Sequence, residues 1–398
     1  GDTFNDTFSG IAIDGQKIII TFDKIAPDAL LTFTQFAPVP KSEFEGIDPL
    51  QVQQAPFFQH PIGCGPFMVE EVNMKNYTIL APFDKYYNGV ADFKIQLLPS
   101  AGDSDPNVVT RAKSGNLDYG YTKMVADVQA LEGTPGITVT PIDVRYTRLF
   151  YLNKFDKKDG SPAPLADVRV RQALRYAIDM ETICETLFQG SAVPANALAP
   201  DANLKGGDLN DYNYNPEKAK ELLAEANWDP NTVIKAVYYY TDQATVDLMT
   251  AVQAYLADVG IKMEFELVEG DLATILWTAP ADQTNGPRAV DWDICYAANA
   301  ALSLHEYYDR YRTGSPTNSH TPEDAELNRL IDATNASADV NAQNEAFKEL
   351  IKYENENLFT MALYYQPIFL ITSDKIGDIQ KGTPQFCINW GIQNWNVQ

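Results

Sequence analysis

Few residues in this sequence stand at the spacings that catalysis or metal binding requires. The three histidines are His60, His305 and His320, and no two of them form an HExxH zinc motif. The G-x-S-x-G turn of a serine hydrolase is also missing. A Cys–His pair such as Cys295 with His305 stays open, although its spacing does not indicate a site. We expect each histidine to be an ordinary surface or cleft residue.

Two segments imitate ligand-binding loops without meeting their requirements. Gly63-Cys64-Gly65 resembles the start of a dinucleotide loop, but Pro66 follows at once and no helix opens there. Residues 201–206 resemble the first half of a calcium loop, but Lys205 takes a ligand position and Tyr212 stands where the closing Glu belongs. The chain has 54 acidic residues, so pairs of carboxylates suitable for glycoside hydrolysis can always be found in it. Such pairs indicate an active site only when the distance between the two carboxyl groups is known. We therefore expect a binding protein with no catalytic residue, no metal and no cofactor.

Composition narrows the class of partner. The chain has 398 residues, of which 45% are hydrophobic and 21% charged, as in a folded protein of two or three structural units. Its 54 acidic and 30 basic residues give a formal net charge of −24. Such a charge repels phosphate backbones and anionic headgroups, so we expect no nucleic-acid partner and no binding to a bare membrane surface. No apolar run approaches the ~18 residues of a membrane-spanning helix.

Neither the cysteines nor the N-terminal residues indicate whether the protein is cytosolic or exported. Cys64, Cys184, Cys295 and Cys387 are far apart and form no CxxC motif, so both disulfides and free buried thiols stay open. The opening residues Gly1–Asp6 lack the basic start and apolar stretch of a signal peptide. This fits either a cytosolic protein or a chain whose export signal has been removed.

The elements expected in the first part of the chain are mostly strands. Ile11–Ile13 and Lys17–Phe22 flank Asp14-Gly15, and Asp-Gly accepts the positive φ of a tight hairpin turn. Further extended segments are expected at 67–72, 77–81 and 93–98, followed by a short helix at 105–113.

The second part alternates strands and helices. A strand is expected at 149–152, then a helix capped by Asp167 and a second capped by Asp179. Asn215-Pro216 starts another helix. Strand 233–240, helix 241–259 and alternating strand 261–267 then form a β-α-β unit. Such a unit implies a parallel sheet with a right-handed crossover.

The remaining segments complete an α/β chain. Two helices are expected within 322–358, and 362–372 returns to β structure. Together the elements predict an α/β protein with two lobes, whose ligand lies between the lobes or at strand ends.

Five blocks of sequence follow one another along the chain. The most specific block joins Leu149–Asn153 to Pro164–Asp179. The other four are Pro61–Phe67, Ser114–Asp118, Asn215–Leu223 and Val259–Ile261. In this order the blocks resemble the family 5 extracellular solute-binding proteins, which are the oligopeptide-, dipeptide- and nickel-binding receptors of ABC importers.

The resemblance implies a two-lobed periplasmic-binding-protein-like fold (type II, cluster C) of mixed sheets with flanking helices. Lobe 1 would comprise 1–145 plus 367–398 and lobe 2 would comprise 146–366, with a hinge at the two crossings. Family chains are longer at the N-terminus, so we expect the first strands and most of the extra subdomain to be missing. The chain would then be a fragment or a reduced member of the family.

The resemblance also implies ligand-binding residues, namely Arg148, Tyr296, Asn299 and Tyr365. Arg148 would pair with a ligand carboxylate or with a carboxylate of its own lobe. Peptide-binding members hold the peptide's α-amino group with an aspartate after a W-D strand, which Asp291–Tyr296 matches here. Residues 297–301 contain no acid, and a neutral Asn299 supplies no charge-assisted bond to an ammonium. This favours a neutral ligand such as an oligosaccharide.

Arg169, Arg171 and Arg175 of the block 164–179 are expected to be structural, since they belong to the family's scaffold signature. The implied function is the extracytoplasmic substrate-binding component of an ABC importer, which is not an enzyme and captures a peptide or similar small solute. The implied partners are that oligopeptide or oligosaccharide and the transporter permease subunits. The resemblance also implies a monomer in the periplasm or at the cell surface, anchored to the membrane only by a lipid on the missing N-terminus. A secreted peptide or sugar hydrolase, or a sensory or chaperone-like binding protein, is the alternative from another class.

Overall fold

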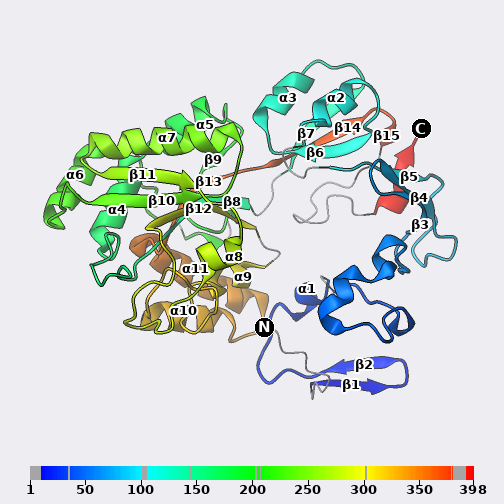
Figure 1. Cartoon of the computed structure of the whole chain (residues 1–398), viewed down its shortest axis with the longest axis horizontal. Helices are drawn as coiled ribbons and strands as arrows, with labels where there is room; N and C mark the ends of the chain where they lie inside the picture. Colours follow the sequence, from blue (N-terminus) through cyan, green and yellow to red (C-terminus); the bar gives the residue numbers. More distant parts are fainter. Residues whose placement is uncertain are drawn as a thin grey trace. The chain divides into compact units, whose positions relative to one another are not determined.

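The computed structural model describes residues 10–34, 36–100, 105–142, 146–201, 204–206, 208–300, 303–377, 379 and 391–398. Contacts divide the chain into two compact units, coloured along the sequence in Figure 1. Unit 1 comprises Gly1–Thr140, Phe369–Thr383 and Cys387–Gln398, and unit 2 comprises Pro141–Ile368 and Pro384–Phe386. That these units work as the two lobes of a trap, with boundaries at 145/146 and 366/367, stays a prediction.

Unit 2 is built on a six-stranded mixed sheet with the order β11-β10-β12-β8-β13-β9. Strand β10 is parallel to β11 and β12, while β8 is antiparallel to β12 and β13, and β9 is antiparallel to β13. The parallel pair confirms the predicted β-α-β unit. The strands are β8 (Tyr146–Leu152), β9 (Val193–Pro194), β10 (Val233–Tyr238), β11 (Lys262–Leu267), β12 (Ile294–Ala300) and β13 (Thr360–Tyr365).

Helices cover both faces of this sheet, as the positions of α7 and of α10 and α11 in Figure 1 show. One face packs against α4 (Val168–Ala177), α5 (Met180–Thr186), α6 (Pro216–Glu225) and α7 (Gln243–Asp258). The other packs against α8 (Leu272–Trp277), α9 (Leu304–Asp309), α10 (Ala325–Thr334) and α11 (Val340–Asn357). Side chains alternate between the faces: Phe150 and Leu152 of β8 join the first cluster, and Leu149 and Tyr151 join the second. We name these the α7 face and the α11 face.

The predicted helix starts are confirmed at atomic level. The side chain of Asp167 accepts from the backbone N–H of Arg169, and that of Asp179 accepts from Thr182. Asn215 accepts from Lys218 N with Pro216 at the first helical position. These local signals need only neighbouring residues, so the sequence reveals them directly.

Arg171 and Arg175 of α4 are buried although they lie off its apolar stripe, whereas Arg169 is half-exposed and pairs with Asp167. Arg171 donates to the carbonyl oxygens of Asn357, Leu165 and Ala166 at 2.7–3.0 Å. Arg175 donates to the carbonyl oxygens of Tyr212 and Ala195.

Unit 1 consists of small sheets and short helices. The hairpin β1 (Ile11–Asp14) and β2 (Lys17–Ile20) turns at Gly15, whose φ is +60°, and confirms the predicted Asp-Gly turn. Strands β3 (Phe67–Asn73), β4 (Tyr77–Pro82) and β5 (Ile95–Leu97) form one sheet, and β6 (Tyr119–Thr122), β14 (Ile368–Ser373) and β7 (Ile137–Ile142) form another. The other elements are β15 (Ile376–Gly377), β16 (Asn396–Val397), α1 (Ala29–Thr34), α2 (Val108–Lys113), α3 (Val125–Leu131), and the 3-10 turns Lys41–Glu43, Pro49–Gln54, Pro56–Gln59 and Ile392–Asn394.

Several predicted strands differ from the structure in extent, and two of these differences bear on the candidate site. The strand expected at 149–152 begins at Tyr146, because Thr147 and Arg148 are buried in it despite their polarity. The β segment expected at 362–372 is two strands, β13 and β14, interrupted at Gln366-Pro367. They join different sheets, β13 in unit 2 and β14 beside β6 and β7.

Candidate functional site

The candidate site lies at one edge of the unit 2 sheet. Strands β10 and β12 are parallel, and β8 is antiparallel to both β12 and β13. The start of β8 therefore lies at the same edge as the carboxyl ends of β10, β12 and β13. In α/β sheets, ligands bind outside the carboxyl ends of the parallel strands. Of the predicted residues, Arg148, Asn299 and Tyr365 come from these strand ends, and Tyr296 lies within β12 beside Tyr238, the last residue of β10.

Arg148 is the centre of this edge. It is 8% exposed, and its guanidinium carbon lies 4.3 Å from the ring centre of Tyr240, 5.1 Å from that of Tyr146 and 5.7 Å from that of Tyr296. Its Nε donates to Oε1 of Gln366 at 3.0 Å. Its Nη1 is buried and has no hydrogen-bond partner among the described residues. A charged donor therefore lies in an aromatic enclosure with part of its bonding capacity unused.

A β-bulge completes the enclosure. Between Ala362 and Tyr364 the β13–β8 register shifts by one residue, so Tyr364, rather than Leu363, pairs with Arg148. The hydroxyls of Tyr364 and Tyr296 then lie 2.7 Å apart, joining β13 to β12 on the α7 face. The bulge therefore places a fourth tyrosine beside the guanidinium.

Burial keeps these tyrosines neutral. Desolvation raises the pKa of Tyr240, Tyr296 and Tyr364 above the ordinary value of a phenol. Nearby Arg148 lowers each pKa, but less than burial raises it. The rings thus offer π faces and hydroxyls to the cation, but no formal negative charge.

The other two predicted residues lie on the opposite face. Asn299 pairs with Thr147, one step along the ladder from Arg148, and its alternation with Ala297 places it on the α11 face. Its Nδ2 is buried without a partner among the described residues. Tyr365 donates to the carbonyl oxygen of Ala197 at 2.7 Å. The structure thus brings Arg148 and Tyr296 together, but separates them by the sheet from Asn299 and Tyr365.

Tyr365 also lines a hollow of about 530 Å³ beside the edge strand β9. Lys205 donates to the Tyr365 hydroxyl at 2.7 Å, and burial lowers the pKa of Lys205. Asp211 accepts from Asn196 on the same wall. The volume is in the range of small-molecule sites, but its polar groups already bond to one another.

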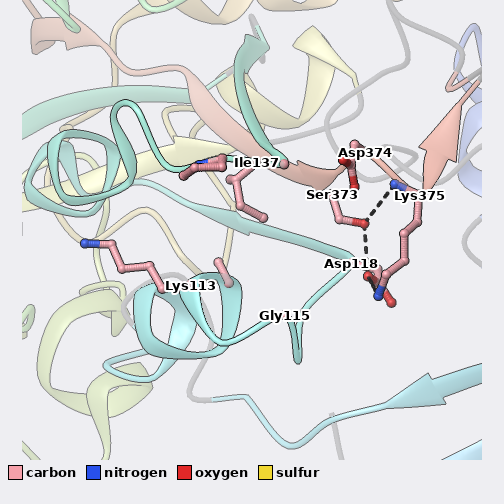
Figure 2. Close-up of a pocket in the computed structure, with 10 residues that line it drawn as sticks. Lys113, Gly115, Asp118, Ile137, Ser373, Asp374 and Lys375 are labelled. Atoms are coloured by element: carbon pink, nitrogen blue, oxygen red, sulfur yellow. Dashed lines mark hydrogen bonds and ion pairs between the residues drawn. The ribbon is translucent and has the colours of Figure 1, made fainter.

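A second hollow, of about 320 Å³, lies in unit 1 and is drawn in Figure 2. Asp118 accepts from Ser373 at 2.9 Å and from Lys375 at 3.0 Å, while Lys113 points away from this group in Figure 2. The backbone N–H of Asp374 donates to the carbonyl oxygen of Gly136 at 2.9 Å. These contacts hold the β14–β15 turn against β6 and β7. The edge around Arg148 therefore stays the stronger candidate.

Comparison with known proteins agrees with the sequence blocks. The model of the bacterial extracellular solute-binding proteins, family 5 (middle region), matches residues 2–321. The chain belongs to this family. It spans about half the length of the curated relatives it matches: a Brucella ovis protein provisionally named an ABC transporter peptide-binding protein is 28% identical over 256 residues, which are 63% of this chain and 47% of the relative.

Solved structures of family 5 type resemble the whole chain. The oligopeptide-binding protein AppA of Bacillus subtilis, in complex with a nonapeptide, has a TM-score of 0.75 at 18% identity and covers 98% of this chain and 78% of its own. NikZ of Campylobacter jejuni, in complex with Ni(L-His), has a TM-score of 0.75 at 17% identity and covers 97% and 78%. This likeness confirms the predicted α/β periplasmic-binding-protein-like fold.

Two histidines of this family 5 chain are buried, so the expectation of surface or cleft histidines is wrong for them. His320 is fully buried, and neither ring nitrogen has a hydrogen-bond partner in the described part of the chain. Its ring packs against Tyr151 and Tyr311, and burial lowers its pKa well below the ordinary value. His305 is buried with Nε2 near the Thr334 carbonyl at 3.1 Å. Long-range packing, which no local spacing encodes, buries both rings.

The described cysteines are free thiols. Cys64 is exposed, Cys184 and Cys295 are buried, and Cys387 lies outside the described residues. Burial raises the pKa of Cys184 to about 12 and also raises that of Cys295. A neutral Cys295 is a poor nucleophile, which argues against the Cys295–His305 pair.

Among the residues that the structure describes, no group of three or more His, Cys, Asp or Glu side chains could hold a metal ion. No helix in those ranges is long and apolar enough to cross a membrane.

Three tyrosines at the site escaped the sequence analysis, namely Tyr146, Tyr240 and Tyr364. Tyr240 follows directly after β10, where a residue at a strand's carboxyl end is a reasonable candidate. Tyr146 stands two residues before Arg148 and so shares its face of β8. Tyr364 could not be assigned from alternation, because the bulge at Leu363 reverses the face that alternation predicts.

Proposed function

We propose that this chain captures a peptide or similar small solute for an ABC importer, and that the solute binds at the Arg148 edge of unit 2. The observation that carries the proposal is the buried Arg148 guanidinium, enclosed by tyrosines and with Nη1 unpartnered among the described residues. The family consists of solute-binding proteins, and a relative is named for peptide binding and the ABC transporter. The proposed partners are therefore the solute and the permease subunits of the importer.

The proposed mechanism needs no chemical conversion. An open form admits the solute, and closure of two lobes at the crossings near 145/146 and 366/367 retains it. The solute favours closure only by the difference between its affinities for the closed and open forms. The proposed location is extracytoplasmic, with a lipid anchor in the full-length protein.

A thermal-shift screen tests the proposal. Peptides, neutral oligosaccharides and nickel–histidine chelates are added separately, and a solute at 100 times its Kd should stabilise the protein by about 2.7 kcal/mol. Tyr240→Leu should weaken the response at least several-fold, because it removes the ring nearest Arg148. The matched control is Tyr87→Leu, since Tyr87 is 86% exposed in unit 1.

Two results would contradict the proposal. One is a wild-type protein that no solute of the three classes stabilises. The other is recovery of a bound peptide or sugar in hydrolysed form, detected by mass spectrometry, which would favour the hydrolase alternative.

A further inference from the structure

We propose that Asn88 is a site of covalent self-modification, at which the backbone nitrogen of Gly89 converts the asparagine side chain into aspartate and isoaspartate. The reactants are the chain itself and water. The site lies in unit 1, and the inference goes beyond the proposed function because no solute takes part in the reaction.

The chemistry is an acyl transfer within one dipeptide. The Gly89 nitrogen loses its proton and bonds to the side-chain carbonyl carbon of Asn88, and ammonia leaves, so that a cyclic succinimide forms. Water then opens the ring at either of its carbonyl carbons, which gives aspartate or isoaspartate. The net change consumes water and releases ammonia, with no oxidation or reduction. Glycine favours ring closure, because it has no Cβ to hinder the approach of its nitrogen.

The sequence motif alone does not single out this position. Two Asn-Gly pairs occur in the chain, Asn88-Gly89 and Asn285-Gly286. Both asparagines are exposed to solvent, so exposure does not distinguish them either. The two pairs differ in what holds the nitrogen that must attack.

A closed turn holds the nitrogen at Asn285. The N–H of Gly286 donates to the carbonyl oxygen of Asp282 at 3.1 Å. The Oδ1 of Asp282 also accepts from the N–H of Thr284 at 2.9 Å and from that of Asn285 at 3.1 Å. The turn is tight, since a Cβ on Gly286 would lie 2.5 Å from the Asp282 carbonyl oxygen. Ring closure here must break the Gly286 hydrogen bond and turn its peptide plane, which costs free energy.

The corresponding atoms at Asn88 are not held. The N–H of Gly89 donates to no acceptor in the described part of the chain, and the Asn88 side chain makes no hydrogen bond there. Gly89 has a φ of +97°, and a Cβ at this position would contact Oδ1 of Asn394 at 3.5 Å. Attack by the Gly89 nitrogen therefore has no such hydrogen bond to break and little to displace.

The modified residue would lie against the C-terminal turn of unit 1. The backbone carbonyl of Asn88 accepts from Nε2 of the buried Gln393 at 3.4 Å. Nearby, the ring of Trp395 packs on Tyr119 with centres 4.9 Å apart. In isoaspartate the main chain runs through the former side chain, so this carbonyl becomes a free carboxylate and the chain gains one methylene group. The reaction thus changes both the charge and the position of the acceptor that Gln393 uses.

Peptide mapping by mass spectrometry tests the inference. The folded, full chain is incubated at mildly alkaline pH, and the replacement of the side-chain NH2 by OH is followed at Asn88 and Asn285 in the same molecules. We expect Asn88 to be modified at least about fivefold faster, as the loss of one backbone hydrogen bond at Gly286 implies. An isoaspartate-specific methyltransferase, which does not act on aspartate, identifies the isoaspartate product.

The same chain unfolded in urea is the matched control. Unfolding removes the hydrogen bond of Gly286 and leaves the sequence unchanged, so the rate at Asn285 should rise toward the rate at Asn88. In the Asn88→Gln variant, ring closure is slower because the ring would be larger, so most of the isoaspartate formed in the folded protein should disappear. The side chain of Asn88 is exposed and makes no hydrogen bond to the described residues, so this variant keeps the native contacts.

Three results would overturn the inference. One is a rate at Asn88 in the folded protein that is equal to or lower than the rate at Asn285. Another is a rate difference that persists in full in urea, because the flanking sequence and not the turn would then cause it. The third is an Asn88→Gln protein that forms as much isoaspartate as wild type. None of these results bears on solute capture, which the thermal-shift screen tests separately.

Discussion

Buried ionisable side chains lie beneath the strands that carry the candidate site. Lys154 donates to the carbonyl oxygens of Leu152 at 2.6 Å and Phe359 at 2.7 Å, which ties the end of β8 to the residue before β13. Glu354 of α11 is buried, and its Oε1 has no partner within the described residues. Burial raises the pKa of Glu354 to about 8 and lowers that of Lys154 well below its ordinary value. Unit 2 therefore holds a carboxyl group that is protonated at neutral pH.

Glu354→Gln should stabilise the protein at neutral and higher pH. The native carboxyl keeps its proton up to about pH 8, whereas in the unfolded chain it loses the proton near the ordinary value of about 4.3. The native state thus binds more protons between these values, so the free energy of unfolding falls as pH rises through them. The neutral amide removes this loss, with a gain of up to about 3 kcal/mol at pH 7.

Urea unfolding at pH 5 and pH 8 measures this gain. The variant should differ from wild type mainly at pH 8, and Glu356→Gln, an exposed change on the same helix, should show no such difference. Equal differences at the two pH values would show that Glu354 does not titrate as its burial implies.

The hydroxyl pair of Tyr296 and Tyr364 should couple in a double-mutant cycle. Either single change to Phe leaves the other buried hydroxyl without the partner that it has at 2.7 Å, at a cost of about 1 kcal/mol or more. The double change removes both groups, so its cost should be less than the sum of the single costs. Thermal unfolding of the four proteins gives the coupling, and strict additivity would mean that the pair contributes nothing specific.

Helix α7 has an aspartate at each end, and removing the two carboxylates should change the stability of the protein in opposite directions. Asp242 caps its N-terminus by accepting from Thr245, and Asp258 is the last residue of the same helix. A carboxylate suits the positive end of the helix dipole and opposes the negative end. The helix packs on the α7 face behind the candidate site, so its stability bears on the position of Tyr240.

The two ends should respond with opposite signs. Asp242→Ala should lower stability by about 1 kcal/mol through loss of the cap, and Asp258→Ala should raise it by about 0.3–1 kcal/mol. Chemical unfolding of both variants in low salt checks this. If both changes moved stability in the same direction, cap and dipole would not be the controlling effects.

The chain divides into two units, with breaks that include Thr140/Pro141 and Ile368/Phe369, and in the proposed function these units act as the two lobes. A solute that binds the closed form more tightly must shift the population toward that form. Small-angle scattering should therefore show a smaller radius of gyration with a saturating peptide than without it. An unchanged radius with demonstrated binding would contradict the hinged-trap mechanism while leaving solute capture intact.

The sequence by itself determined the features that depend on near neighbours. The Asp-Gly hairpin, the caps at Asp167, Asp179 and Asn215, and the β-α-β unit each need only residues within a few positions or a regular period. The ordered blocks also indicate the family, and the resemblance points to both Arg148 and Tyr296, whose side chains lie in contact.

Only the tertiary structure decided how distant residues meet. The sheet order brings Tyr146, Tyr240 and Tyr364 around Arg148, and the bulge at Leu363 selects the face on which Tyr364 lies. Packing also buried His320 and left Nη1 of Arg148 without a partner among the described residues. Hydrogen-bond partners and burial depend on which strands become neighbours, and residue spacing along the chain does not specify this.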